Sequence, residues 1–124
     1  MSKTLTDRES DIMRVLWDRG ACRVSDVRRH LKDALAHNTV LTMLGILEDK
    51  GFVRREAQGR GHVYFAIVPE KEARYSAVRH LVAKFFRGSS DLLITHLVSD
   101  RHLSSAQIER LRKLLQDAGD EEQP

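Results

Sequence analysis

Apolar residues recur at helical spacing through the first part of the chain. Between residues 7 and 18 they fall on one face, and Gly20 follows as a helix stop. Thr6 and Glu9 have the spacing of a capping box, in which each side chain bonds the backbone amide of the other residue. The pattern predicts a first helix over residues 7–18.

Two shorter helical patterns follow, and about three residues separate them. The first is predicted to begin at a Ser25 cap and to end near Ala34. The second is predicted to begin at a His37-Asn38 cap. Its residues Val40, Leu44 and Leu47 are predicted to face the core. Two helices joined by so short a loop are typical of a helix-turn-helix.

The pattern changes to strand-like alternation after Gly51. Residues 52–57 and 63–67 predict the two strands of a hairpin, and the turn between them is predicted at Gln58-Gly59-Arg60-Gly61. One face of the second strand is expected to be buried, because Val63, Phe65 and Ile67 alternate with His62, Tyr64 and Ala66. Residues 22–24 tolerate β structure, which allows a short third strand beside the hairpin.

After Pro69 the chain returns to helical patterns. They predict helices over about residues 70–87 and 92–98, the second capped by Ser89 or Ser90. A last helix begins with a capping-box spacing at Ser104, and the acidic tail, residues 120–124, is expected to be disordered. We therefore predict a mainly α fold with a small β-hairpin. A winged helix-turn-helix domain spans residues 1–69, and a helical dimerisation segment spans residues 70–124.

The last three helices need a partner, because about 55 residues in three short helices offer little to fold around. The apolar stripe of residues 92–98 is too wide for a single contact, so a second copy of the chain is the expected partner. The sequence predicts a homodimer joined through residues 72–118. The predicted dimer contacts are Tyr75, Val78, Leu81, Val82, Phe85, Leu93, Leu97, Ile108, Leu111 and Leu115.

The excess positive charge lies in the first half of the chain. Residues 1–69 contain twelve Lys and Arg against nine Asp and Glu, whereas residues 70–124 contain nine of each group. A basic half favours a polyanionic partner such as nucleic acid.

Composition argues against several other classes of protein. No apolar run approaches the roughly 20 residues that span a membrane, and the first residues lack a signal-peptide pattern. The only cysteine, Cys22, is predicted to be a small buried apolar residue. With no membrane span, signal peptide or disulfide predicted, a cytoplasmic location is expected. The six histidines lack the spacings of zinc sites, so we expect no metal. No nucleophile motif or phosphate-binding glycine loop is present, so we expect neither catalysis nor a cofactor.

The third predicted helix and the hairpin carry side chains suited to DNA. Such a helix can enter the major groove while the hairpin tip reaches the neighbouring backbone. Asn and Thr bond base edges, and basic side chains contact phosphates. The predicted base or groove contacts are Asn38, Thr39, Thr42 and Met43, and the predicted phosphate contacts are Arg28, Arg54, Arg60 and His62.

Each of these positions also has a purely structural interpretation. Asn38 and Thr39 can form a helix cap, charge on an edge strand discourages aggregation, and Arg28 can belong to a solvated helix face. Phosphate contact is favoured at Arg60, because the glycines on either side of it bring the backbone close.

Motifs along the chain resemble a known family. They are Leu5-Thr6-x-x-Glu9-x-x-Ile12-Met13-x-x-Leu16-Trp17, Asn38-Thr39-Val40-x-Thr42-x-Leu44, Lys50-Gly51-x-Val53-x-Arg55, Gly59-Arg60-x-x-x-Tyr64, Phe86-x-Gly88-Ser89 and Leu103-Ser104. With these motifs the chain resembles the BlaI/MecI/CopY family of penicillinase-type repressors over essentially its whole length.

The resemblance implies a dimeric winged-helix repressor that occupies a palindromic operator and controls a β-lactam-resistance or related stress operon. It implies recognition-helix roles for Asn38, Thr39 and Thr42 and a wing role for Arg60. In the β-lactam branch, a membrane-bound sensor metalloprotease triggers cleavage of an Asn-Phe bond in the dimerisation half. The matching position here is His96-Leu97, and the C-terminal cysteine cluster of copper-responsive members is absent.

The alternative function is a protein-interaction module. In that case the winged helix is a docking scaffold without sequence-specific DNA binding, and the C-terminal helices bind a different protein. A stable monomer that binds no duplex would favour this alternative.

Overall fold

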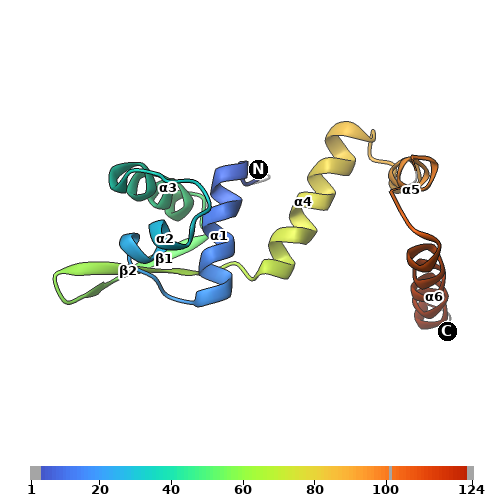
Figure 1. Ribbon diagram of the computed structural model, residues 1–124. Coiled ribbons are helices and arrows are strands. Elements are labelled where there is room, and N and C mark those ends of the chain that lie inside the picture. The colour runs from blue at the N-terminus through green and yellow to red at the C-terminus, as the bar shows by residue number, and fades with distance from the viewer. Residues whose placement is uncertain (1–3, 101, 123–124) are drawn as a thin grey trace. The chain divides into compact units, whose positions relative to one another are not determined.

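The computed structural model describes residues 4–100 and 102–122, which form helices and one two-stranded antiparallel sheet (Figure 1). In chain order the elements are α1 (Asp7–Arg19), α2 (Val24–His30), α3 (His37–Asp49), β1 (Val53–Gln58), β2 (Gly61–Ala66), α4 (Glu70–Phe85), α5 (Ser90–Ser99) and α6 (Ser105–Glu122). The predicted mainly α fold with a small hairpin is confirmed.

The chain divides into two compact units, residues 1–80 and 81–124, and the boundary between them falls within α4. The functional division predicted between residues 69 and 70 remains a prediction, because compactness does not identify what each part does.

The first unit is built around a core that α1, α2, α3 and the hairpin share. The three residues of α3 predicted to face inward, Val40, Leu44 and Leu47, have no exposed surface. Cys22 is buried as predicted, and burial raises the pKa of its thiol above the ordinary value. The buried apolar residues are Ile12, Met13, Val15, Leu16, Cys22, Val24, Val27, Val40, Leu44, Leu47, Phe52, Val53 and Tyr64.

The start of α1 is tied to the end of α3 by a buried charge pair. The predicted capping box is confirmed: Thr6 Oγ1 accepts from Glu9 N at 3.2 Å, and Glu9 Oε1 accepts from Thr6 N at 2.8 Å. Lys50 Nζ lies 2.7 Å from the same Glu9 oxygen and also donates to the Thr4 carbonyl. Burial alone would raise the pKa of Glu9, but the bonds from Lys50 and Thr6 outweigh it and lower the pKa.

The predicted bounds of the second and third helices were wrong. Arg23 is the N-cap of α2 in place of Ser25, and α2 ends at His30, well before Ala34. Residues 31–36 form a longer loop than predicted, and Leu31 begins it with extended backbone. The side chain of Arg28 stabilises this loop, because its Nε donates to the Leu35 carbonyl at 2.9 Å.

The cap predicted at His37-Asn38 was also wrong. Ala36 is the N-cap of α3 and offers no side-chain hydrogen bond, so His37 and Asn38 lie inside the helix. The core-facing residues of α3 were nevertheless identified correctly, because helical periodicity does not depend on the residue at which a helix begins.

The hairpin lies with one face against the core, and its turn extends beyond α1, α2 and α3 (Figure 1). Tyr64 is the buried residue of β2, so the buried face is the one that carries Tyr64 and not the one that carries Val63. Tyr64 exchanges two backbone hydrogen bonds with Cys22, at 2.7 and 2.9 Å. The third strand suggested for residues 22–24 is therefore a single bridge.

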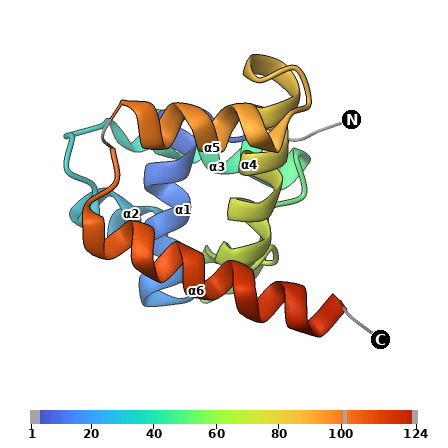
Figure 2. The same ribbon diagram turned by 90° about the vertical axis from the view of Figure 1, so that its right-hand side faces the viewer.

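The second unit begins inside α4 and contains α5 and α6 as separate helices (Figure 2). Ser89 caps α5, and Ser104 and Gln107 form the reciprocal bonds expected of a capping box, at 2.8 and 3.2 Å. α4 ends at Phe85, and Arg87 and Gly88 follow with positive φ of 52° and 77°. The tail predicted to be disordered is helical as far as Glu122, and residues 123–124 lie outside the described part.

Side chains in the second half of the chain are poorly covered. Among the side chains described from residue 67 to residue 118, none is buried. No helix within the described ranges is long and apolar enough to cross a membrane.

Candidate nucleic-acid interface

The outward face of α3 is polar and exposed. Because Val40, Leu44 and Leu47 point into the core, helical geometry turns Asn38 and Thr42 to the opposite side. Asn38, Thr39 and Thr42 are all exposed. These three predicted base-contacting residues therefore share an accessible surface.

Met43, the fourth residue predicted to contact bases, is placed differently. It is half-buried and packs against the core cluster. Its side chain is less available to a partner than those of Asn38 and Thr42, and its packing supports the position of α3.

The two faces of the hairpin carry different predicted phosphate contacts. In the antiparallel register, Arg55 is paired with Tyr64 and Ala57 with His62, so Arg55 and His62 lie on the face that meets the core. Arg54 is paired with Phe65 and lies on the opposite face. The Nε atom of Arg55 lies 3.7 Å from a carboxylate oxygen of Glu48 in α3. Arg54 and His62 are both exposed and were both predicted to contact phosphates, but they lie on opposite faces of the hairpin.

Arg60 occupies the tip of the hairpin between two glycines. Gly59 has a φ of 64°, a left-handed conformation that favours glycine. Arg60 is exposed, and no ion pair holds it among the described residues. The turn thus presents a guanidinium at the point of the first unit that extends beyond the helices (Figure 1).

Arg23 positions the tip of the hairpin, a role that the sequence did not reveal. Its Nη2 donates to the Gln58 carbonyl at 2.7 Å, and a Cβ on Gly61 would lie only 2.8 Å from its Nη1. Glycine at position 61 therefore permits the close approach of this guanidinium. The contact links residues 35 positions apart, so local spacing contains no sign of it.

Arg23 also lines an open groove of about 290 Å³ between α3 and the hairpin. His37 and Leu41 from α3 and His62 from β2 line the same groove. The sequence predicted His37 as part of a cap, whereas in the fold it lines the same groove as His62. The groove joins the two elements that were predicted to contact DNA.

Arg28, another predicted phosphate contact, is exposed but already used within the chain. Its Nε bonds the Leu35 carbonyl, which leaves the other N–H groups of the guanidinium to face a partner. The structure therefore gives Arg28 a loop-stabilising contact, and its phosphate contact stays a prediction.

The predicted dimer contacts lie on surfaces that their own chain covers little. Phe85 is 66% exposed, and none of the ten residues is buried. The exposed members are Tyr75, Val78, Leu81, Phe85, Ile108 and Leu115, and the half-buried members are Val82, Leu93, Leu97 and Leu111. His96 and Leu97, the predicted cleavage position, lie in α5, with His96 exposed and Leu97 half-buried.

One group of side chains in the described residues has the composition and spacing of a candidate metal site, whereas the sequence predicted no metal. His96, Asp100 and His102 bring three ligand atoms within 4.8 Å of one another. His96 lies in α5, and Asp100, four residues later, is the C-cap of that helix. This spacing could have been recognised as a chelating pair. The third ligand lies beyond the end of the helix, where helical periodicity no longer applies.

Comparison with known proteins identifies similar sequences over most of the chain. A model of the penicillinase repressor family matches residues 5–117. The methicillin resistance regulatory protein MecI of Staphylococcus aureus (strain N315) is 24% identical over 114 residues, covering 90% of this chain and 92% of that protein. An uncharacterized 16.5 kDa protein in the ptsI 3′ region of Latilactobacillus sakei is 31% identical, covering 90% of this chain and 77% of that protein.

Solved structures show a similar fold. The Bacillus licheniformis BlaI monomeric form, in complex with the blaP half-operator, aligns with a TM-score of 0.50 and 26% identity over 58% of this chain and 90% of that chain. The oxidized form of MarR from E. coli aligns with a TM-score of 0.52 over 92% of this chain and 75% of that chain. Its identity of 17% carries the likeness no further than the winged-helix fold.

Proposed function

Since the chain belongs to the penicillinase repressor family, we propose that this transcriptional repressor binds a palindromic operator as a homodimer. α3 enters the major groove of each half-site, and the turn between β1 and β2 contacts the neighbouring phosphates. The two-fold axis of the dimer places the two recognition helices about one turn of DNA apart, roughly 34 Å, or somewhat more. The regulated genes form a β-lactam-resistance or related stress operon.

One observation carries the DNA-binding proposal. The exposed polar face of α3 lies beside a basic hairpin that Cys22 and Arg23 hold in place. Amide and hydroxyl groups on such a face can bond base edges, whereas Arg60 at the tip can bond phosphates. The aligned BlaI chain is described in complex with a half-operator, which supports the same use of this unit here.

The homodimer proposal rests on the apolar surface of α4, α5 and α6. These helices have no buried side chain in the described part of the chain, and large apolar residues such as Tyr75, Phe85 and Leu115 are more than half exposed. Exposed apolar area of this extent marks an interaction surface. A second copy of the same chain satisfies it with two-fold symmetry, which matches a palindromic site.

The central test is a selection of binding sites from a random duplex library, followed by anisotropy titrations at several salt concentrations. We expect a palindromic consensus and a steep loss of affinity with salt, because each phosphate contact releases a counterion. Equal affinity for scrambled duplexes, or binding that does not change with salt, would exclude the proposal. A stable monomer that binds no duplex would instead support a protein-interaction module.

Two substitutions separate the roles of the helix and the hairpin. Arg60→Ala should weaken binding to consensus and scrambled duplexes alike, whereas Thr42→Val should change the preference among sequences. Arg110→Ala is the matched control, because it removes an exposed arginine from α6. Identical effects of the Arg60 and Thr42 substitutions would contradict the assigned roles.

We further propose that release from the operator follows cleavage at His96-Leu97 after a membrane-bound sensor protease is activated. The measurement is mass spectrometry of the repressor after co-expression with a sensor protease encoded by a neighbouring gene. A fragment that ends at residue 96 is expected. An intact chain in induced cells would exclude release by this route.

A further inference from the structure

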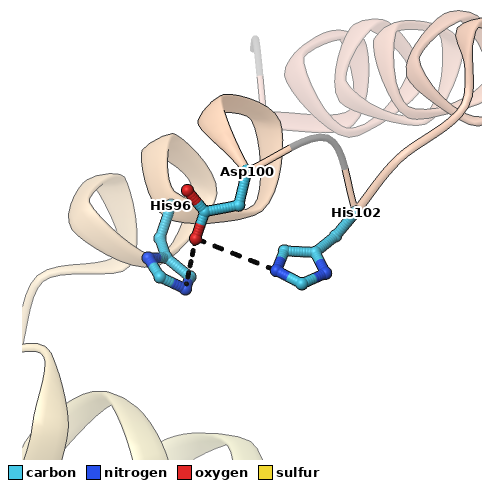
Figure 3. Close-up of side chains that lie close together, drawn as sticks. All are labelled: His96, Asp100 and His102. Atoms are coloured by element: carbon cyan, nitrogen blue, oxygen red, sulfur yellow. Dashed lines mark ion pairs between the residues drawn. The ribbon is translucent and has the colours of Figure 1, made fainter.

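Two imidazoles and one carboxylate meet at the C-terminal end of α5 (Figure 3). His96 Nε2 lies 3.1 Å from Asp100 Oδ2, and His102 Nε2 lies 3.9 Å from the same oxygen. All three side chains are exposed. The cluster lies in the second unit and does not include any residue assigned to DNA contact.

The three ligand atoms are close to the spacing that a metal ion requires. In a tetrahedral site with bonds of about 2.0–2.2 Å, ligand atoms lie roughly 3.3–3.6 Å apart. The two distances to Asp100 bracket this value, and the three atoms lie within 4.8 Å of one another. Small rotations of exposed side chains are enough to close the remaining gap.

Two ring contacts limit the orientations of the imidazoles. The ring of Phe86 meets that of His96 edge-on, with centroids 5.9 Å apart and an interplanar angle of 62°. The rings of His96 and His102 stack with centroids 5.9 Å apart at 28°. Both nitrogens that approach Asp100 therefore come from rings that already have packing partners, which lowers the entropy lost when an ion is bound.

The contacts of His96 and His102 with Asp100 can also be interpreted as two exposed ion pairs. Exposed pairs of this kind contribute only about 0–1 kcal/mol to stability. A bound ion contributes more, because it joins the end of α5 to the segment before α6 in a unit that buries no described side chain. Small segments without a sufficient core are commonly stabilised in this way.

We propose that His96, Asp100 and His102 bind a Zn²⁺ ion, with the fourth position open to water. Two imidazoles and one carboxylate suit zinc, whereas Mg²⁺ and Ca²⁺ prefer oxygen ligands throughout. A groove of about 390 Å³, lined by Phe85, Phe86 and Leu92 together with His96 and Asp100, gives the ion access. The bound ion bridges the peptide segment that begins at the proposed cleavage position, His96-Leu97.

The test is a competition titration of the full chain, prepared without a histidine tag, with zinc chloride and a chromophoric chelator. We expect one equivalent of Zn²⁺ per chain. His96→Asn, Asp100→Asn and His102→Asn should each weaken binding at least about tenfold, because even the loss of an outer-shell partner costs 10–100-fold. Asp91→Asn is the matched control, since it removes an exposed carboxylate from the first turn of α5.

A second measurement uses Co²⁺ as a spectroscopic probe at the same site. Binding should produce visible d–d bands of a four- or five-coordinate ion that disappear in the three ligand variants and persist in Asp91→Asn. Circular dichroism of each variant establishes that the helices remain. The proposal is overturned if wild-type protein shows no saturable binding, or if the ligand variants bind as tightly as the control.

Discussion

The two units of this chain contain similar apolar residues, but the first unit buries them and the second exposes them. In the first, Leu44 on α3 is fully buried, whereas in the second Leu114 on α6 is 57% exposed. Both residues follow a helical pattern, and most of the stability of a helix in a protein comes from packing of its apolar face. The difference teaches that apolar spacing identifies a face to be covered and leaves open whether the same chain or another one covers it.

The largest difference between the units is expected when one leucine in each is truncated and the free energy of unfolding is measured. Leu44→Ala is expected to lower the free energy of unfolding by about 2–5 kcal/mol, because it opens a cavity in a packed core. Leu114→Ala should cost less than about 1 kcal/mol in dilute solution, since its side chain is already largely in water. Urea denaturation measures both values, and equal costs would mean that the second unit has its own core.

The second largest difference is expected when one charged pair in each unit is broken and the loss of stability is compared. Lys50→Met leaves the Glu9 carboxylate, which is 4% exposed, without its cation and should cost about 1–3 kcal/mol. Arg112→Met removes the partner of Glu109, but both side chains of that pair are well exposed. Its cost should stay below about 0.5 kcal/mol. Similar losses measured by urea denaturation would show that the first pair is more hydrated than its burial indicates.

The same pair predicts a pH dependence. The pKa of Glu9 is held below its ordinary value of 4.5, so the folded state favours the ionised carboxylate. The resulting stability is fully present above the ordinary pKa and is lost as the pH falls below it, through the folded pKa. The advantage of the wild-type chain over Glu9→Gln should therefore shrink below about pH 4.5. An advantage that stays constant down to pH 3 would contradict this account.

Substitution of an exposed aromatic residue sharpens the comparison by testing what covers the second unit. Phe85→Ser should weaken dimerisation by about tenfold or more, because aromatic anchors carry much of the energy of an interface. The unfolding of the first unit should not change. Ile67→Ser is the control, since Ile67 is an exposed apolar residue of the first unit. Sedimentation measures the dimer constant, and an unaffected constant would remove Phe85 from the interface.

The smallest effect concerns two glycines. A Cβ on Gly45 in α3 would meet nothing within 4 Å, so Gly45→Ala should raise the free energy of unfolding by about 1 kcal/mol. Gly88, between α4 and α5, has a φ of 77°, and Gly88→Ala should lower stability by about 1 kcal/mol. Thermal melts distinguish the two signs. A destabilised Gly45→Ala would indicate a close contact at this face of α3.

Features that depend on near neighbours were predictable from the sequence. The capping boxes at Thr6 and Ser104, the Ser89 cap and the inward residues of α3 follow from spacings of three or four positions. The hairpin and its turn were also located within a residue or two, because glycines bracket the tip.

Features that depend on distant residues were missed. The early end of α2 was not visible, because the loop after it is stabilised by the Arg28 side chain and not by local helix signals. Two further features were visible only in the folded chain: Arg23 positions the hairpin, and His37 and His62 line one groove. The predicted DNA-contacting and dimer residues stay predictions, whose surfaces the structure describes but whose partners it does not contain.

The sequence by itself determined the order of the helices, the hairpin, the family and the residues of α3 that enter the core. These depend on periodicity and on local hydrogen bonds, which operate within a few residues. Only the tertiary structure decided that Tyr64 defines the buried face of β2, that Arg23 holds the hairpin tip and that His102 joins His96 and Asp100. Those contacts arise where separate elements or a turn bring side chains together, and no repeating interval in the sequence encodes such distances.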